Sequence, residues 1–116
     1  MATDTYLLDR MRMVLKEKHA LWTEKRMFGG DCFLVDDKMC FATIKGGILA
    51  RVGPNNIDEL TAKPGAEQMI HGGRIMTGYL FIEPDGYDLD DDLEFWIEKC
   101  LEFNPLANSN KKKNKQ

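Results

Sequence analysis

Residues 21–52 read LWTEKRMFGGDCFLVDDKMCFATIKGGILARV, and this stretch decides the fold. Short apolar runs alternate with glycine pairs and with the dipeptide Asp36-Asp37. This pattern predicts four strands, over residues 21–27, 31–35, 39–43 and 48–52. The connections at Asp36-Asp37 and Lys45-Gly46-Gly47 are too short for a crossover, so the strands are expected to form an antiparallel meander.

The hairpin closed by Asp36-Asp37 predicts which side chains share a face of the sheet. Its simplest register gives three opposite pairs: Val35 with Lys38, Phe33 with Cys40, and Cys32 with Phe41. One face then carries Cys32, Leu34, Met39 and Phe41, and the other carries Phe33, Val35, Cys40 and Ala42. The two cysteines point to opposite faces and cannot bind one metal ion together. Because both faces are apolar, helices on one side only would leave the second face needing cover from a tail, a further helix or another subunit.

Helical periodicity appears on both sides of the meander. Residues 4–19 are predicted to form a helix that Thr3 or Asp4 can cap. Its apolar face is Leu7, Leu8, Met11, Val14 and Leu15. A short helix over residues 57–62 and two strands, 67–70 and 74–82, follow the meander.

The last helix is the clearest element in the sequence. Asp88 is the predicted N-cap, and three further aspartates in the first turn suit the positive end of the helix dipole. The apolar face is Leu89, Leu93, Trp96, Ile97, Cys100 and Leu101, and Asn104-Pro105 ends the helix. The order is α-β-β-β-β-α-β-β-α, which predicts an α+β, two-layer α/β sandwich with an antiparallel sheet.

Size and charge limit the classes of function. A chain of 116 residues fits a single domain. The net charge is −3, with nine acids in residues 83–103 and four lysines, Lys111, Lys112, Lys113 and Lys115, near the C-terminus. A duplex-DNA binder usually carries a basic stripe on folded structure, so residues 107–116 are interpreted as a disordered, lysine-rich tail. Three cysteines at unrelated spacings, no signal sequence and no membrane-length apolar run predict a cytoplasmic protein without membrane contact.

No motif in the sequence predicts an enzyme, a cofactor or a metal site. Cys-x-x-Cys and His-x-x-x-His spacings are missing, and no glycine pair belongs to a phosphate-binding fingerprint. His19 is interpreted as a cation at a helix C-terminus, His71 as a turn residue and Cys100 as buried packing. Gly29-Gly30 is interpreted as a tight turn, with a backbone surface for a partner as the alternative.

Two parts of the chain together resemble the N-terminal domain of the TfoX/Sxy competence regulators. The first is the motif Arg26-Met27-Phe28-Gly29-Gly30, followed by the hairpin from Phe33 to Phe41 and by Arg51-Val52. The second is Arg74-x-Met76-x-Gly78-Tyr79, followed by the helix that contains Trp96. The resemblance implies a TfoX N-terminal-like domain over residues 1–106, with a secretion-chaperone-like fold and no established catalytic residues.

The chain departs from this bacterial family in two places. Asp37 stands where the family often has glycine, so the hairpin is expected to use a different turn. The two-domain competence regulators also carry a helical C-terminal domain, and a lysine-rich segment stands in its place here. The fold is therefore expected to transfer, whereas the competence role does not follow from the resemblance.

The sequence leaves three functions open. The first is a non-catalytic regulatory or protein-interaction domain with an unknown protein partner or a second copy as a homodimer. Its candidate surface is Arg26, Met27, Phe28, Gly29, Gly30 and Arg51. The second is a nucleic-acid-associated regulator, although direct DNA binding is disfavoured by the charge pattern; its basic surface would be Arg10, Arg12, Lys16, Lys18, Lys25 and Arg26. The third is an enzyme or anion-binding protein with Arg26, Arg51 and Arg74 around the ligand.

Overall fold

The computed structural model describes residues 5–27 and 29–107. The predicted cap at Thr3 or Asp4 and the predicted lysine-rich tail from residue 108 onward lie outside this part of the chain. The helices and strands are α1 (Thr5–Glu17), β1 (Trp22–Met27), β2 (Gly30–Val35), β3 (Lys38–Ile44), β4 (Gly47–Arg51), α2 (Ile57–Leu60), β5 (Ala66–His71), β6 (Arg74–Ile82) and α3 (Asp90–Phe103). Short 3-10 turns η1 (Pro54–Asn56), η2 (Pro84–Gly86) and η3 (Asn104–Leu106) complete the fold. The predicted α+β element order is confirmed.

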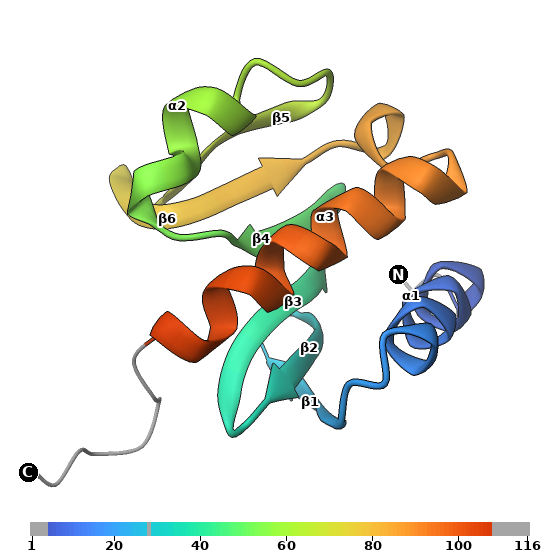
Figure 1. Cartoon of the computed structure of the whole chain (residues 1–116). Helices are drawn as coiled ribbons and strands as arrows, with labels where there is room; N and C mark the ends of the chain where they lie inside the picture. The colour runs from blue at the N-terminus through green and yellow to red at the C-terminus, as the bar shows by residue number, and fades with distance from the viewer. Residues whose placement is uncertain (1–4, 28, 108–116) are drawn as a thin grey trace, which may run out of the picture.

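All six strands belong to one antiparallel sheet in the order β1-β2-β3-β4-β6-β5. The meander continues from β1 to β4, after which β6 pairs with β4 and leaves β5 at the outer edge. Helices α1 and α3 lie side by side against one face of this sheet (Figure 1). The domain therefore has two layers, and β1 and β5 are its edge strands.

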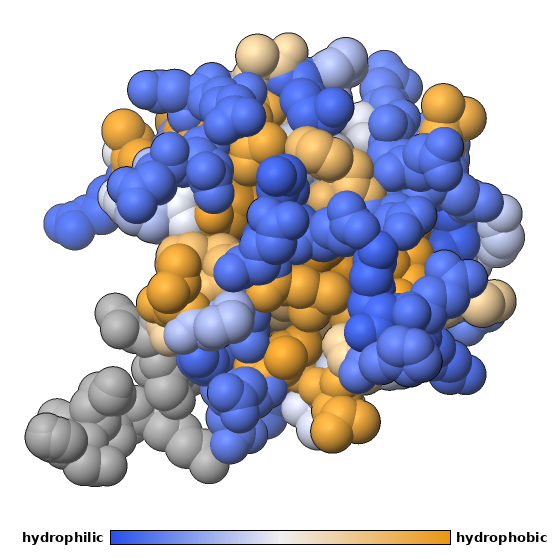
Figure 2. All heavy atoms as spheres, viewed as in Figure 1, coloured by the Kyte–Doolittle hydropathy of each residue, from blue (hydrophilic) through white to orange (hydrophobic). Residues whose placement is uncertain are grey.

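The helices bury most of the apolar faces that the periodicity predicted, except that Leu89 is exposed and Leu101 is only partly buried. The predicted α1 face is buried over its whole length, as are Leu93, Trp96, Ile97 and Cys100 of α3. The Trp96 indole N–H donates a 2.9 Å hydrogen bond to the Gly86 carbonyl, so this large ring is buried without losing its polar contact. Figure 2 shows hydrophilic residues over much of this side of the molecule, with hydrophobic side chains at the surface between them.

The predicted N-cap of the last helix is wrong. The helix begins at Asp90, and its N-cap is Leu89, which makes no side-chain capping bond and is 67% exposed. The Asp88 carbonyl oxygen instead accepts a 3.1 Å hydrogen bond from Arg10 Nη2, and Asp90 forms a 3.2 Å ion pair with Arg10 Nε. This contact joins α1 to the segment before α3, and no side chain caps the start of α3.

His19 ends α1 through its backbone. It has a positive φ of 60°, and its N–H donates to the Lys16 carbonyl at 3.0 Å. The next N–H, of Ala20, donates to the Leu15 carbonyl at 3.0 Å. These two bonds form a Schellman motif, in which glycine usually holds the position of His19.

A β-bulge changes the predicted register between β2 and β3. Leu34 pairs with Met39 as expected, but Phe33 pairs with Phe41 and not with Cys40. Cys40 is the extra residue, and both it and Phe41 contribute to the helix-side core. The Phe33 and Phe41 rings stack with centroids 4.7 Å apart.

The bulge corrects the predicted faces of two residues. Phe41 lies on the helix side and Ala42 on the opposite side, the reverse of the prediction. The separation of Cys32 and Cys40 onto opposite faces is confirmed.

The second sheet face carries a separate apolar cluster drawn entirely from strands: Cys32, Leu34, Met39, Ala42 and Leu49. No member of this cluster is more than 8% exposed. The partly buried Met27, Ile44, Met69 and Tyr79 pack around it. The centre of the second face is therefore already buried within one chain.

The turn between β2 and β3 keeps positive φ at both central residues, 60° at Asp36 and 64° at Asp37. This is the backbone of a type I′ turn, which glycine adopts more easily than aspartate. The expectation that Asp37 would force a different turn is wrong. The buried Leu34–Met39 pair next to the turn fixes the register of the two strands. The two aspartates therefore adopt the strained positive φ values that this register requires.

Candidate functional site

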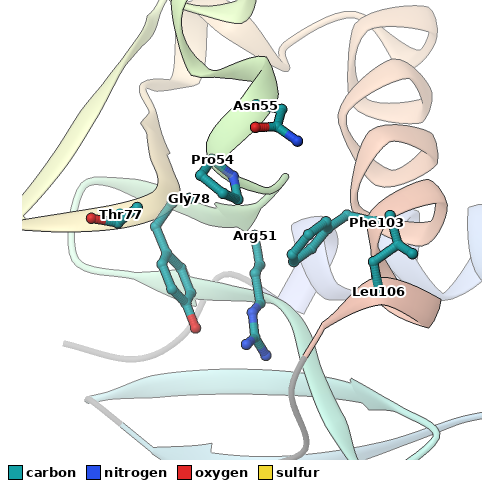
Figure 3. A pocket seen from close by; sticks show the side chains of 8 residues that line it. Arg51, Pro54, Asn55, Thr77, Gly78, Phe103 and Leu106 are labelled. Atoms are coloured by element: carbon teal, nitrogen blue, oxygen red, sulfur yellow. The ribbon is translucent and has the colours of Figure 1, made fainter.

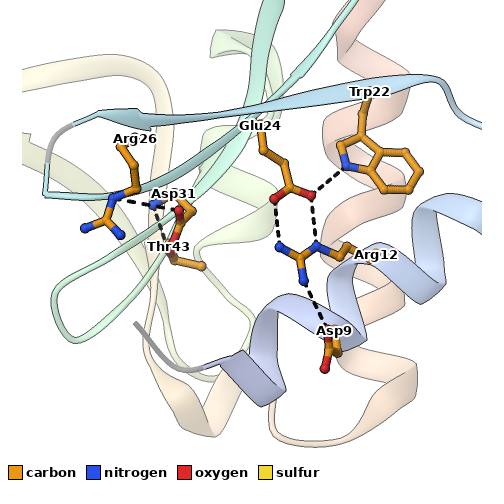
Figure 4. A network of polar contacts seen from close by, with 7 residues as sticks. All are labelled: Asp9, Arg12, Trp22, Glu24, Arg26, Asp31 and Thr43. Atoms are coloured by element: carbon orange, nitrogen blue, oxygen red, sulfur yellow. Dashed lines mark hydrogen bonds and ion pairs between the residues drawn. The ribbon is translucent and has the colours of Figure 1, made fainter. Parts of the chain in front are cut away.

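The motif segment Arg26–Gly30 connects β1 to β2, and Phe28 lies outside the described residues. Met27 packs against the second-face cluster, and the Arg26 side chain is 68% exposed, 3.8 Å from the Asp31 carboxylate (Figure 4). Gly29 has a positive φ of 76°. A Cβ on Gly30 would lie 1.7 Å from the Thr43 carbonyl oxygen, so β3 requires glycine there. Both described glycines thus have a structural reason to be in the motif.

The structure does not bring Arg26, Arg51 and Arg74 together. Arg26 pairs with Asp31 near the start of β2, whereas Arg51 is the last residue of β4. These positions are at opposite ends of the antiparallel sheet. Arg74 begins β6, five residues before Tyr79, the partner of Arg51. Arg74 pairs with His71 and Leu80 with Gln68, so about three extended residues of β5, roughly 10 Å at 3.3 Å per residue, span the distance from Arg74 to the level of that pair. The site predicted from the three arginines is not assembled.

Acidic side chains contact four of the six cations of the predicted basic surface, one of which is Arg26 near Asp31. Arg10 is paired with Asp90, and Arg12 forms ion pairs with Glu24 and Asp9. Lys18 binds both Glu94 and Glu98, and the hydrogen bond that its ammonium group donates to Glu94 is the main cause that raises the lysine pKa. These cations join α1 and the turn after it to α3 and β1, which leaves fewer positive charges for a nucleic acid.

A bulge in β6 forms one wall of a groove at the end of β4. Four residues, 76–79, lie between Ile75 and Leu80 of β6, whereas only Met69 separates their partners in β5. The amide Nε2 of Gln68 fills the gap and donates to the carbonyls of Met69, Met76 and Tyr79 at 2.9–3.1 Å. Gly78, with a φ of 86°, turns its carbonyl toward the N–H groups of residues 52 and 53 at 3.0 Å.

The groove has a volume of about 390 Å³ and combines three parts of the chain. Its lining is Arg51, Pro54, Asn55, Thr77, Gly78, Tyr79, Phe103 and Leu106. Figure 3 shows the Arg51 side chain beside the Phe103 ring, below Pro54 and Asn55. The guanidinium carbon lies 5.5 Å from the Tyr79 centroid and 5.9 Å from the Phe103 centroid. Arg51 Nη1 also donates to the Met39 carbonyl at 3.4 Å.

This arrangement gives the groove a defined binding chemistry. Both rings lie within cation–π distance of the guanidinium carbon, which favours this position of the arginine. Leu106 stands 76% exposed at the rim and offers an apolar contact. Arginine and aromatic side chains are enriched among the residues that dominate protein interfaces. The groove thus suits a polypeptide that presents a carboxylate beside an apolar side chain.

Of the groove residues, only Arg51 was predicted to belong to a partner surface, although Gly78 and Tyr79 are part of the motif that carries the family resemblance. Pro54 and Asn55 follow Arg51 closely in the chain. Residues 77–79 reach the groove through the β4–β6 pairing, and Phe103 and Leu106 reach it through the packing of α3 and η3. One signal was available, because an isolated glycine inside a strand pattern, such as Gly78, often marks a bulge or a close backbone approach.

Thiol chemistry is disfavoured by burial. Cys32, Cys40 and Cys100 are all unpaired and buried. Burial raises the pKa of Cys32 to about 11 and that of Cys100 well above its ordinary range. The two histidines lie at opposite edges of the sheet, because His19 precedes β1 and His71 is the last residue of β5. Among residues 5–27 and 29–107, no group of three or more side chains is arranged to hold a metal ion.

Comparison with known proteins identifies the kind of domain. Residues 15–104 match the TfoX N-terminal domain family, and this span is more than three quarters of the chain. The chain belongs to the TfoX N-terminal domain family. The match begins within α1 and ends at the residue after α3, so it includes all six strands. No curated protein and no solved structure matches the chain.

The family span contains both the Arg26–Gly30 motif and most of the groove lining. In this TfoX N-terminal domain, the motif closes the connection between β1 and β2, and Arg51 marks the groove at the other end of the sheet. Within the described part of the chain, no helix has the length and apolar character needed to cross a membrane.

Proposed function

We propose that this TfoX N-terminal domain is a non-catalytic, regulatory protein-interaction domain that binds its partner in the groove around Arg51. The observation that carries the proposal is the Arg51 guanidinium lying between the Tyr79 and Phe103 rings. The preferred partner is a cytoplasmic protein with an exposed segment that carries a carboxylate and an apolar residue. The carboxylate would approach the guanidinium, and the apolar residue would contact Leu106.

Three observations support binding over catalysis or nucleic-acid recognition. The thiols are buried, and the pKa values of Cys32 and Cys100 are raised, which disfavours a thiolate nucleophile. The three arginines expected around an anionic substrate lie apart along the sheet. Four of the six candidate DNA-binding cations are engaged by carboxylates of the same chain.

The proposal is tested by affinity capture from the native cytosol with quantitative mass spectrometry. The variants are Arg51→Met, which removes the charge, and Leu106→Glu, which changes an exposed rim residue. Arg74→Met is the matched control, because Arg74 is an exposed arginine on the same sheet outside the groove. Circular dichroism and thermal unfolding establish that each variant is folded.

The expected result is a partner captured by the wild type and by Arg74→Met but depleted at least tenfold with both groove variants. Equal capture by all four proteins would contradict the groove as the binding site. A captured partner whose binding depends on Arg74 and not on Arg51 would place the interaction on the β5–β6 hairpin instead.

A further inference from the structure

The two edges of the sheet differ in their suitability for pairing with another strand. On β1, residues 23–26 are all exposed, and three of them are charged: Glu24, Lys25 and Arg26. Charged side chains along an edge strand oppose edge-to-edge association. A two-fold pairing of β1 centred on any of these three residues would also place like charges directly opposite one another.

The β5 edge carries no such protection at its centre. Residues 68–70 are Gln68, Met69 and Ile70, none of them charged. Ile70 is 58% exposed, and its partner across the β5–β6 ladder, Ile75, is 66% exposed. The hairpin therefore presents an exposed isoleucine pair directly beside the outer edge of the sheet.

The bulge next to this edge lies in β6 and leaves β5 continuous. All six residues of β5 are in extended strand conformation, and the extra residues belong to β6. The Gln68 amide supports the bulged carbonyls from within the sheet. Edge strands are often guarded by a bulge of their own, and β5 has none.

We infer that the β5 edge pairs with β5 of a second copy of this chain, which joins the two sheets into one continuous antiparallel sheet. The two-fold register centred on Met69 is self-complementary. It places Glu67 opposite His71 of the second copy, and it does so twice because of the symmetry. Directly opposite residues share a sheet face, so the carboxylate and the imidazole lie on the same side.

The alternative registers are less favourable. A shift by two residues places Glu67 opposite either Met69 or Gly73 of the second copy. With Met69 at the centre, Ile70 lies opposite Gln68 of the second copy and diagonal to that copy's Ile70, a spacing of roughly 7–8 Å that branched side chains can bridge. The exposed isoleucines of both copies then form one row on the helix side.

Sedimentation velocity of the full chain over a range of concentrations tests the inference. The expected result is a monomer–dimer equilibrium that Ile70→Lys weakens at least tenfold. Met13→Lys is the matched control, because Met13 is 59% exposed on α1, nearly the same as Ile70, and lies away from β5. A wild type that stays monomeric at the highest concentration overturns the inference, as does a dimer that Met13→Lys disrupts and Ile70→Lys does not.

Oxidative cross-linking tests the register. Met69→Cys places two thiols opposite each other at a Cα separation of about 4.5–5.5 Å, within disulfide reach. In Glu67→Cys, by contrast, each introduced thiol lies opposite residue 71 of the second copy, four positions along the strand from the other introduced thiol. The native cysteines are buried and leave a low background. Rapid covalent dimer formation by Met69→Cys and not by Glu67→Cys is expected; the opposite result overturns the register.

A charge exchange provides an independent check. Glu67→Lys is expected to weaken the dimer, and adding His71→Glu in the same chain to restore it. No rescue would contradict the predicted pairing. Arg51→Met is expected to dimerise like the wild type, so loss of the dimer and loss of the groove partner can be distinguished.

Discussion

The guanidinium of Arg12 donates two hydrogen bonds, of 2.8 and 2.9 Å, to the carboxylate of Glu24 (Figure 4). The first residue belongs to α1 and the second to the edge strand β1, so the pair fixes the outermost strand against the helix layer. The Trp22 indole N–H adds a third bond to the same carboxylate at 3.0 Å. Hydrogen bonding from Arg12 is the main cause that lowers the pKa of Glu24.

Replacement of Glu24 by glutamine should reduce the free energy of unfolding by about 0.5–1 kcal/mol at pH 7, the magnitude of a well-formed surface ion pair. Because the folded-state pKa is lowered from 4.5, the stabilisation is fully present above that pH and is lost as the pH falls through the folded-state pKa. Urea unfolding of both proteins between pH 7 and pH 3 measures this difference. Glu17→Gln on the exposed side of α1 is the control, and a Glu24→Gln difference that does not decrease in acid would contradict the prediction.

Replacement of Asp37 by glycine should stabilise the domain by about 0.5–1 kcal/mol. A φ of 64° is unfavourable for a residue with a Cβ atom but not for glycine. Thermal or urea unfolding measures the effect. Asp58→Gly, the same change within α2, should instead destabilise by up to about 1 kcal/mol. A loss of stability in Asp37→Gly would show that the aspartate side chain contributes more than its backbone strain costs.

Replacement of Gly30 by alanine should destabilise the domain by about 3 kcal/mol, because the new methyl group would force β3 to move. Gly72→Ala separates this steric effect from backbone strain. Gly72 has a positive φ of 61° but nothing within 4 Å of an added Cβ, so only about 1 kcal/mol is expected there. Equal losses in the two variants would mean that the contact with Thr43 does not restrict residue 30.

Thiol-specific reagents should modify none of the three cysteines in the native protein at pH 8. Burial blocks access, and the raised pKa values of Cys32 and Cys100 keep these two thiols protonated. The modification rate should rise at least 100-fold in guanidinium chloride, where all three react. A thiol that reacts at the unfolded rate while circular dichroism stays native would contradict the buried assignment.

The sequence by itself determined the elements of this protein and their order. The helical period of α1 and the leucine, tryptophan and isoleucine spacing of α3 reflect burial along one side of a helix, which is a local property of the chain. Glycine pairs and Asp36-Asp37 marked the strand ends for a similar reason, since the conformations allowed at a turn depend on a few adjacent residues. The family motif could likewise be read from contiguous residues.

The tertiary structure alone decided the sheet order, the registers and the groove. Nothing local requires β6 to pair with β4, or Cys40 to become a bulged residue. These outcomes depend on how long-range strand pairing and helix packing fit together in one core. The same is true of the start of α3: Asp88 is a residue type that favours the N-cap, but the helix begins at Asp90, and the Asp88 carbonyl accepts a hydrogen bond from Arg10 of a distant helix. Arg51 was visible as one residue of a motif, but its place between Tyr79 and Phe103 exists only because three distant segments meet at the end of β4.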